Sequence, residues 1–350
     1  MPTSGLIFES VQTSPSNIAL IKYWGKKGFG YQLPENPSLS FTLTQSTSTA
    51  HLKLFDKREA PSFLEKTFPL QVIFEGQRQE RLEQKIIHWL KKTFFLKTGK
   101  TAEHFYWEWH TSNTFPMGTG IASSASSFAA MAHCLTQAYK FFQETSPYSI
   151  SSLARLGSGS AARSVNNGWA HWGFDSEEEA SFFTPSHSYF TELCDAIILA
   201  DTSEKKISSS QGHELMANHD YKTIRHERSL RHFHQCLEIL TTDYSDDENN
   251  TILHKNAHTL FEIAQKEALE LHALMMTAAS PYFLIRPTTL EILEKILLFK
   301  EEVNFPVGFT LDAGPNVHLL FFKENKEEVT NFLQTSLASH HEILHDSCSI

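Results

Sequence analysis

The chain has few cysteines, no long apolar run and no excess of positive charge. Its four cysteines, Cys134, Cys194, Cys236 and Cys348, are far apart and form no Cys-x-x-Cys pair, which argues against a disulfide framework or a zinc knuckle. Reduced cytoplasmic thiols are the simplest account of them. No stretch reaches the ~18 apolar residues of a membrane span, and the first twelve residues lack the features of a signal peptide. We therefore expect a cytoplasmic protein without a membrane partner.

The net charge of the chain argues against one class of binding partner, nucleic acid. The formal net charge is −10, whereas binding to nucleic acid without sequence preference needs a basic face, so we expect no nucleic-acid partner. A small anionic substrate remains compatible, because a few local cations can reverse the field inside a cleft. With 350 residues and 41% hydrophobic residues, the chain is long enough for two domains or one large one with a sizeable core.

Alternating and helical patterns follow one another along the chain, which predicts an α+β fold. Strand patterns occupy residues 18–26, 38–55, 104–112 and 194–200, and a strand, a glycine turn and a second strand occupy residues 307–322. Helical patterns occupy residues 80–97, 150–165, 250–279, 288–301 and 327–339, besides the helix that follows residue 122. A change of domain near Asp201 divides the chain into residues 1–200 and 201–350.

The segment NTFPMGTGIASSASS, from Asn113 to Ser127, is the most informative part of the sequence. Gly118 and Gly120 allow a tight turn and a close approach of the backbone to a ligand. The helix that follows offers free N–H groups and the positive end of its dipole, which suit a phosphate. On these residues alone, a phosphate cradle and a turn made for packing both remain open.

Lysines interrupt an apolar run in SPSNIALIKYWGKK, where Lys22, Tyr23 and Lys26 lie on one predicted strand and its exit. Buried lysines are rare unless they are paired, so these positions indicate a site. The alternative is an edge strand whose lysines discourage aggregation.

Two later segments carry complementary chemistry. In GSGSAARS, Ser158 and Ser160 precede Arg163, whose guanidinium could fork onto phosphate oxygens. In LDAGPN, Asp312 ends an apolar strand and is followed by a rigid Gly-Pro turn, a mounting suited to a general base. Read alone, Asp312 could equally be an ordinary turn residue.

Three further motifs fit common signatures but are rejected. HEILH at His341–His345 has the zincin spacing, yet it leaves no room for a third ligand, and a solvated helix end is the better interpretation. Gly99-Lys100-Thr101 resembles the end of a Walker A loop, but Phe94 replaces the first glycine, so we expect a turn before a strand. HFHQC at His232–Cys236 has no second ligand cluster in the sequence.

Taken together, the segments resemble the GHMP kinase superfamily and, within it, the diphosphomevalonate decarboxylases. The matching strings are NIALIKYWGK, LPENPSLSFTL, NTFPMGTGIASSAS, GSGSAARS, EKKISSSQG and FTLDAGPN, in the family's order from Ser14 to Asn316. The resemblance implies an N-terminal half like ribosomal protein S5 domain 2 and a ferredoxin-like C-terminal half around a deep cleft. It also implies ATP- and Mg²⁺-dependent decarboxylation of mevalonate 5-diphosphate to isopentenyl diphosphate in the mevalonate route to isoprenoids.

The resemblance further implies roles for individual residues. Asp312 would be the catalytic base and Lys22 would neutralise charge beside it. The ATP phosphates would be held by the glycine-serine loop, with Ser123 or Ser124 near Mg²⁺. The implied ATP-binding residues are Asn113, Pro116, Gly118, Gly120, Ser123 and Ser124; the implied substrate-binding residues are Tyr23, Lys26, Ser158, Ser160, Arg163 and Ser209.

Some positions depart from the commonest family pattern and keep alternatives open. Met117-Gly118-Thr119 replaces Thr-Ala-Ala, Val165-Asn166-Asn167 stands where an aromatic residue and a glycine are common, and His213 replaces a frequent Met. A phosphomevalonate decarboxylase or a mevalonate 3-kinase-like enzyme is therefore an alternative, and a non-catalytic binding module is another. The oligomeric state, with a homodimer as one alternative, is not decided by the sequence.

Overall fold

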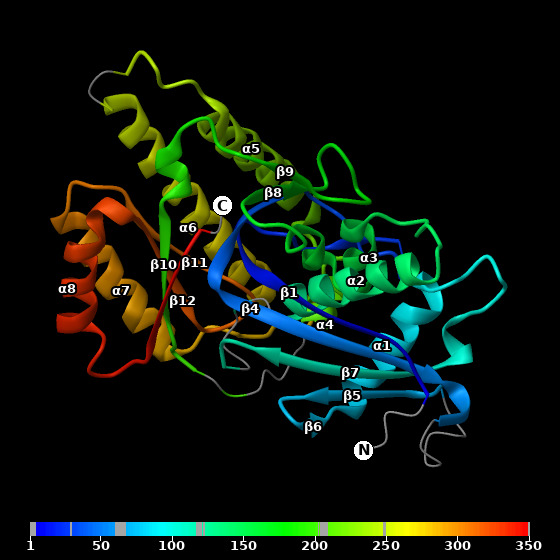
Figure 1. Ribbon diagram of the computed structural model, residues 1–350. Helices are drawn as coiled ribbons and strands as arrows, with labels where there is room; N and C mark the ends of the chain where they lie inside the picture. Colours follow the sequence, from blue (N-terminus) through cyan, green and yellow to red (C-terminus); the bar gives the residue numbers. More distant parts are fainter. Residues whose placement is uncertain are drawn as a thin grey trace.

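A computed structural model describes residues 5–28, 30–59, 68–116, 121, 123–201, 203, 209–247 and 250–348. The described strands form two main sheets, one from each half of the chain, with helices packed on both (Figure 1). The expected α+β class is therefore confirmed.

The first sheet has the strand order β6-β5-β7-β4-β8-β9, with β1 paired along β4. Its strands are β1 (Leu6–Ile21), β4 (Ser38–Asp56), β5 (Leu70–Phe74), β6 (Gln77–Arg78), β7 (Phe105–Asn113), β8 (Trp169–Trp172) and β9 (Ser181–Phe183). The antiparallel register of β1 on β4 runs from Leu6↔Phe55 to Ile21↔Leu39. A two-stranded hairpin, β2 (Lys26–Lys27) and β3 (Leu33–Pro34), follows β1.

One face of this sheet is covered by α1 (Glu80–Thr93), α2 (Ser123–Phe141) and α3 (Ile150–Gly157). Apolar side chains alternate along β7, so that Trp107 and Trp109 point into the core beneath these helices. Trp89 of α1 meets them there and donates its indole N–H to the carbonyl of Leu153 at 2.8 Å. The large aromatic residues thus fix the helices on the sheet.

The second sheet has the order β11-β12-β10-β13 and is antiparallel throughout. Its strands are β10 (Leu193–Ile198), β11 (Val307–Leu311), β12 (Val317–Phe322) and β13 (Ile343–Ser347). One face packs on α7 (Pro287–Glu302) and α8 (Lys326–Ser336), and the other faces α5 (Lys222–Thr241) and α6 (Thr251–Met276). Strands β10, β11 and β12 are therefore buried along their whole length, which explains their mostly apolar sequences.

Helix α6 connects the halves, because it packs on β11 of the second sheet and also on β1 of the first. The shared core contains Ile18 and Leu20 of β1, Phe261 of α6 and Leu320 of β12, all fully buried. Gly308 of β11 allows the close approach of α6, since a Cβ atom there would lie 2.7 Å from Cβ of Phe261. The ends of β1 and β11 are consequently held near each other.

Most elements expected from the sequence are present, with four corrections. The helix expected over residues 150–165 is interrupted: α3 ends at Gly157, because Ser158 is extended, and a 3₁₀ turn over Gly159–Arg163 follows. The segment at His341–His345 is not a helix end: residues 343–347 form β13, which pairs with the edge of β10, because the buried strand β10 needs a hydrogen-bonding partner there. Helix α1 ends at Thr93 instead of residue 97, because Phe94 turns into an aromatic cluster with Phe105 and Trp107. Strand β1 ends at Ile21, so Lys22 follows it.

Several other expectations can be compared with the described residues. The expected turn at Gly99–Thr101 before β7 is confirmed. The four cysteines are free and buried. Within the described ranges, no helix is both long and apolar enough to cross a membrane. Strand β10 pairs in the second sheet although it precedes residue 201; the division of the chain at that residue stays a prediction.

Asp346 of β13 ties the C-terminal strand to the first sheet. Its carboxylate accepts hydrogen bonds from the backbone N–H groups of Thr44, Gln45 and Ser46 at 2.7–2.9 Å, and the residue is buried. We expect Asp346→Ala to lower the free energy of unfolding by about 3 kcal/mol, because buried donors lose a charged acceptor. Urea unfolding measures this loss. The matched variant Asp56→Ala removes an exposed partner of Arg58 and should change the midpoint little; equal shifts for both variants would contradict the assignment.

Candidate active site

Lys22 and Asp312 meet where the two halves adjoin. Lys22 follows β1 and Asp312 follows β11, and the Lys22 Nζ atom lies 2.8 Å from Oδ1 of Asp312. The lysine side chain is 3% exposed and the aspartate side chain 23%, so only the carboxylate opens toward solvent. Burial lowers the pKa of Lys22, and the charges of Asp312 and Glu267 offset part of this effect. The alternative of an edge-strand lysine is therefore wrong for Lys22.

Arg163 adds a second cation beside this pair. It ends the 3₁₀ turn η4 (Gly159–Arg163), is 2% exposed and donates through Nη2 to Oδ1 of Asn17 at 3.2 Å. Its Nε and Nη1 atoms have no hydrogen-bond partner within the described part of the chain. Burial lowers the pKa of Arg163 to about 10, so the group is charged at neutral pH. A buried guanidinium with unused donors indicates a bound anion.

Asn17 organises this part of the site and was missed by sequence reasoning. Its amide donates to the carbonyl of Ser160 at 3.1 Å and to Oγ of Ser164 at 2.7 Å, while its oxygen accepts from Arg163. The turn η4 is thereby fixed against β1. The available signal in the sequence was a polar residue just before the apolar run Ile18–Ile21; the structure shows that Asn17 is buried.

Tyr23 is packed tightly between aromatic neighbours. Its ring centroid lies 4.8 Å from that of Trp172 and 4.4 Å from that of His213. Gly159 leaves room for the phenol, because a Cβ atom there would lie 2.6 Å from the Tyr23 hydroxyl oxygen. Burial raises the pKa of Tyr23, so this hydroxyl stays protonated and can donate a hydrogen bond to an anion.

His213, the position that departs from the family pattern, is buried in the same cluster. Its Nδ1 atom accepts the N–H of Gly25 at 3.0 Å. Burial, followed by the charge of Lys26, lowers the pKa of His213 well below its ordinary value, so the ring is neutral. It therefore adds no charge to the site and holds the turn after Trp24 in place. Lys26, in β2, is half-buried, and burial lowers its pKa.

The start of α2 lies beside the end of α3. The Ser124 and Ser158 hydroxyl oxygens are 3.2 Å apart, and Ser123 is the first residue of α2. Asn113 ends β7, where its side-chain oxygen accepts from the Ser48 hydroxyl at 2.7 Å. A helix N-terminus flanked by hydroxyl groups can hold phosphate oxygens.

The structure brings together Lys22, Tyr23, Arg163 and Asp312, and it places Ser124 beside Ser158. Ser160 is half-buried in η4, and Pro116 is exposed after β7. Gly118 and Gly120 lie outside the described residues, as does the side chain of Ser209, the first residue of α4 (Ser209–Leu215). The predicted roles of all these residues remain predictions.

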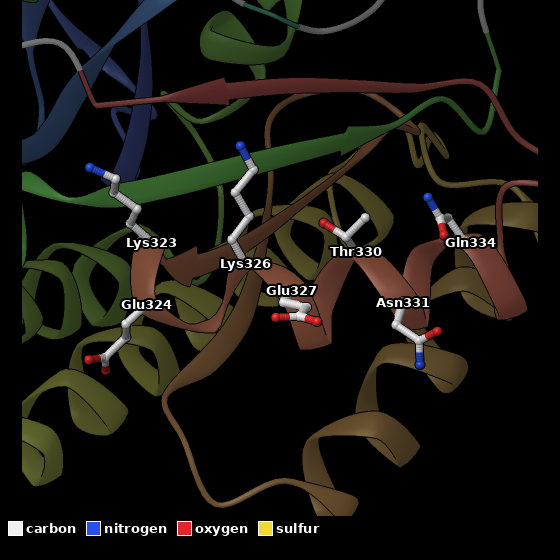
Figure 2. Close-up of a pocket in the computed structure, with 7 residues that line it drawn as sticks. All are labelled: Lys323, Glu324, Lys326, Glu327, Thr330, Asn331 and Gln334. Carbon is white, nitrogen blue, oxygen red and sulfur yellow. The ribbon is translucent and has the colours of Figure 1, made fainter.

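A hollow of about 640 Å³ lies away from these residues, on the outside of α8 and the preceding 3₁₀ turn η6 (Lys323–Asn325). Figure 2 shows Lys323 and Lys326 pointing to one side while Glu324 and Glu327 point to the other. Because these side chains diverge, they do not form a convergent binding site.

Comparisons with known proteins agree along almost the whole chain. Residues 14–183 match the diphosphomevalonate decarboxylase-like N-terminal domain, and residues 196–348 match the mevalonate 5-diphosphate decarboxylase C-terminal domain. A diphosphomevalonate decarboxylase from Debaryomyces hansenii is 28% identical over 333 residues, covering 92% of this chain and 82% of the relative.

Solved structures give the same result. A mevalonate diphosphate decarboxylase from Legionella pneumophila is 29% identical with a TM-score of 0.77, covering 96% of this chain and 100% of its own. A structure described as MDDEF in complex with MVAPP, AMPPCP and magnesium is 26% identical with a TM-score of 0.79, covering 97% of this chain and 96% of its own. These matches confirm the expected GHMP kinase fold.

The unused donors of Arg163 predict binding of a diphosphate. We expect Arg163→Gln to weaken the binding of inorganic pyrophosphate at least tenfold, because charge-assisted hydrogen bonds contribute about 1.5–3 kcal/mol each. Isothermal titration calorimetry measures the change. Arg155→Gln is the matched control: Arg155 is also buried, but it donates to the carbonyls of Glu178 and Tyr31. A similar loss of affinity in both variants would refute the assignment.

Proposed function

Since the chain belongs to the diphosphomevalonate decarboxylase family, we propose that it catalyses the ATP-dependent decarboxylation of mevalonate 5-diphosphate, yielding isopentenyl diphosphate, carbon dioxide, ADP and phosphate. The observation that carries this proposal is the Lys22–Asp312 pair with Arg163 beside it. One accessible carboxylate among buried cations suits proton removal next to a highly anionic substrate. A related protein binds MVAPP together with AMPPCP and magnesium.

Asp312 acts on the 3-hydroxyl of the substrate. A tertiary hydroxyl is a poor leaving group, so the reaction first converts it to a phosphate ester with the γ-phosphoryl group of ATP. The partly exposed carboxylate of Asp312 orients this hydroxyl and accepts its proton. Lys22 and Arg163 stabilise the negative charge that gathers on the transferred phosphoryl group.

Lys22 and Arg163 also assist the second stage of the reaction, in which phosphate and carbon dioxide leave. When the 3-phosphate leaves, positive character develops at C3. The bond between C2 and the carboxylate carbon then breaks, carbon dioxide leaves, and the electron pair of that bond forms the new double bond to C3. Lys22 stays beside the departing phosphate because its ammonium group is anchored on Asp312. Water is kept away on the lysine side, since Lys22 is 2% exposed and Arg163 is 2% exposed.

The binding residues of the two substrates are proposed from the family resemblance. We assign the diphosphate and carboxylate of mevalonate 5-diphosphate to Tyr23, Lys26, Ser158, Ser160, Arg163 and Ser209, as the family resemblance implies. The ATP phosphates are assigned to the loop with Asn113, Pro116, Gly118 and Gly120 and to the start of α2. Mg²⁺ would be held near Ser123 or Ser124, whose hydroxyl groups at a helix start suit a phosphate-bound hard cation, and it would neutralise phosphate charge. A homodimer and a cytoplasmic location stay predictions.

The substrate assignment predicts that purified protein with ATP and Mg²⁺ releases carbon dioxide faster from mevalonate 5-diphosphate than from mevalonate 5-phosphate. The reason is that a second phosphate group adds charge-assisted contacts with the cations of the site. Release of ¹⁴CO₂ from carboxyl-labelled substrates measures both rates. Equal or reversed rates would favour the alternative of a phosphomevalonate decarboxylase.

The role of Asp312 predicts that Asp312→Asn keeps ATP binding but lowers kcat by about 10²–10⁴. The amide preserves the shape of the side chain yet cannot accept the hydroxyl proton. Nucleotide titration and steady-state turnover separate the two effects. Asp175→Asn, which changes a carboxylate paired with His171 outside the site, should leave kcat near its original value. Near-normal turnover of Asp312→Asn would exclude Asp312 as the base.

A further inference from the structure

Helix α6 carries two buried side chains that bond the backbones of Lys22 and Asp312. Glu267 Oε2 accepts the N–H of Lys22 at 3.0 Å, and His272 Nε2 lies 3.1 Å from the carbonyl oxygen of Asp312. Because a carbonyl only accepts, His272 Nε2 is the donor. Glu267 is 0% exposed and His272 2%. They are five positions apart in the sequence, which is about 7.5 Å along the helix.

The peptide groups on both sides of Lys22 are held by the same network. Arg225 Nη2 donates to the Lys22 carbonyl at 2.8 Å and to Glu267 Oε2 at 2.7 Å. Asn36 donates to the same Lys22 carbonyl at 2.9 Å. Lys22 lies beyond the end of β1, so these bonds replace the ladder that fixes the backbone of a strand. Their number leaves the lysine backbone little freedom.

Glu267 is kept ionised although it is buried. Its Oε1 atom also accepts from Arg225 Nη1 at 2.8 Å and from His232 Nδ1 at 2.7 Å. Burial raises the pKa of Glu267, but Arg225, His232 and the Lys22 N–H more than offset this and bring it to about 2. The carboxylate therefore accepts from Lys22 throughout the neutral pH range.

A metal ion is the competing interpretation of this cluster. Ligand atoms of His232, Glu267 and Glu270 lie within 4.8 Å of one another. Arg225 forms a fork on Glu267 and is 3.6 Å from Glu270, which also pairs with Arg228. Guanidinium groups thus occupy the acceptor directions that a cation would need, and the cluster is a buried ion-pair network.

We propose that Glu267 and His272 are positioning residues for the reaction, which hold the backbones of Lys22 and Asp312 at a fixed separation through helix α6. This inference rests on the proposed function. Neither side chain needs to touch the substrate. If the bond from Lys22 to Glu267 or the bond from His272 to Asp312 is loosened, the ammonium or the carboxylate group is misplaced. A misplacement of about 1 Å can lower the rate 10²-fold.

The test compares His272→Leu, His272→Gln and His219→Leu. His219 is the matched control, because it is also buried and also bonds a backbone carbonyl. Its Nε2 atom lies 3.0 Å from the carbonyl oxygen of Leu274 in helix α6. In His272→Gln, the amide nitrogen replaces Nε2 and keeps the bond to Asp312. Turnover with ATP and mevalonate 5-diphosphate, thermal unfolding and hydrogen exchange at residues 312–316 are measured for each variant.

We expect His272→Leu to lower kcat about 10–100-fold with the KM for ATP changed less than about twofold, and to speed hydrogen exchange at residues 312–316. His272→Gln should restore most of both, and His219→Leu should lower the unfolding temperature comparably while keeping kcat. Parallel losses of kcat in the two leucine variants, or unchanged exchange at residues 312–316, would overturn the inference.

Glu267→Gln tests the other of the two contacts, the one with the backbone of Lys22. The new amide group would place N–H donors against the donors of Arg225 and His232, which weakens the contact with the Lys22 N–H. We therefore expect faster exchange of the Lys22 amide and a lower kcat. Unchanged values of both would contradict the inference. Should this variant not fold, the His272 set decides alone. Absence of turnover in the unaltered protein would refute the proposed function, whereas the exchange measurements need no turnover and still test the positioning role.

Discussion

The ion pair between Lys22 and Asp312 is the constraint on which the rest of the site depends. A buried ammonium group costs several kcal/mol in desolvation unless a partner is close and well placed, and here the partner comes from the other half of the chain, 290 residues away. The two strand ends must therefore meet for the lysine to stay charged. Such a costly pair marks a functional site more often than a source of stability.

The fold meets this requirement at helix α6, which contacts both halves. Helix α6 packs on β1 and β11, whose ends carry the two charged groups. Arg163 reaches the same place from η4 because Asn17 binds that turn to β1. Three cationic or acidic side chains thus converge from separate elements, while the surface around Asp312 stays open to a substrate.

Much of this could be predicted from the sequence, since the signals were local. Lys22 interrupts an apolar run, Asp312 ends a strand before a Gly-Pro turn, and Arg163 follows a run of small residues. The contacts of Glu267 with Lys22 and Arg225 could not be predicted, because periodicity places residues on a helix face and does not pair residues that are distant in the chain.

The prediction of a helix end at His341–His345 was wrong for a related reason. The spacing of this segment fits a helix, but the edge of β10 provides hydrogen bonds that favour a strand, and tertiary context overrides weak local preference.

The proposed function requires that the site couples phosphoryl transfer to decarboxylation. The most direct measurement is the ratio of carbon dioxide released to ADP formed from carboxyl-labelled mevalonate 5-diphosphate. A coupled reaction gives a ratio of one to one, whereas ADP formed without carbon dioxide would exclude the coupling.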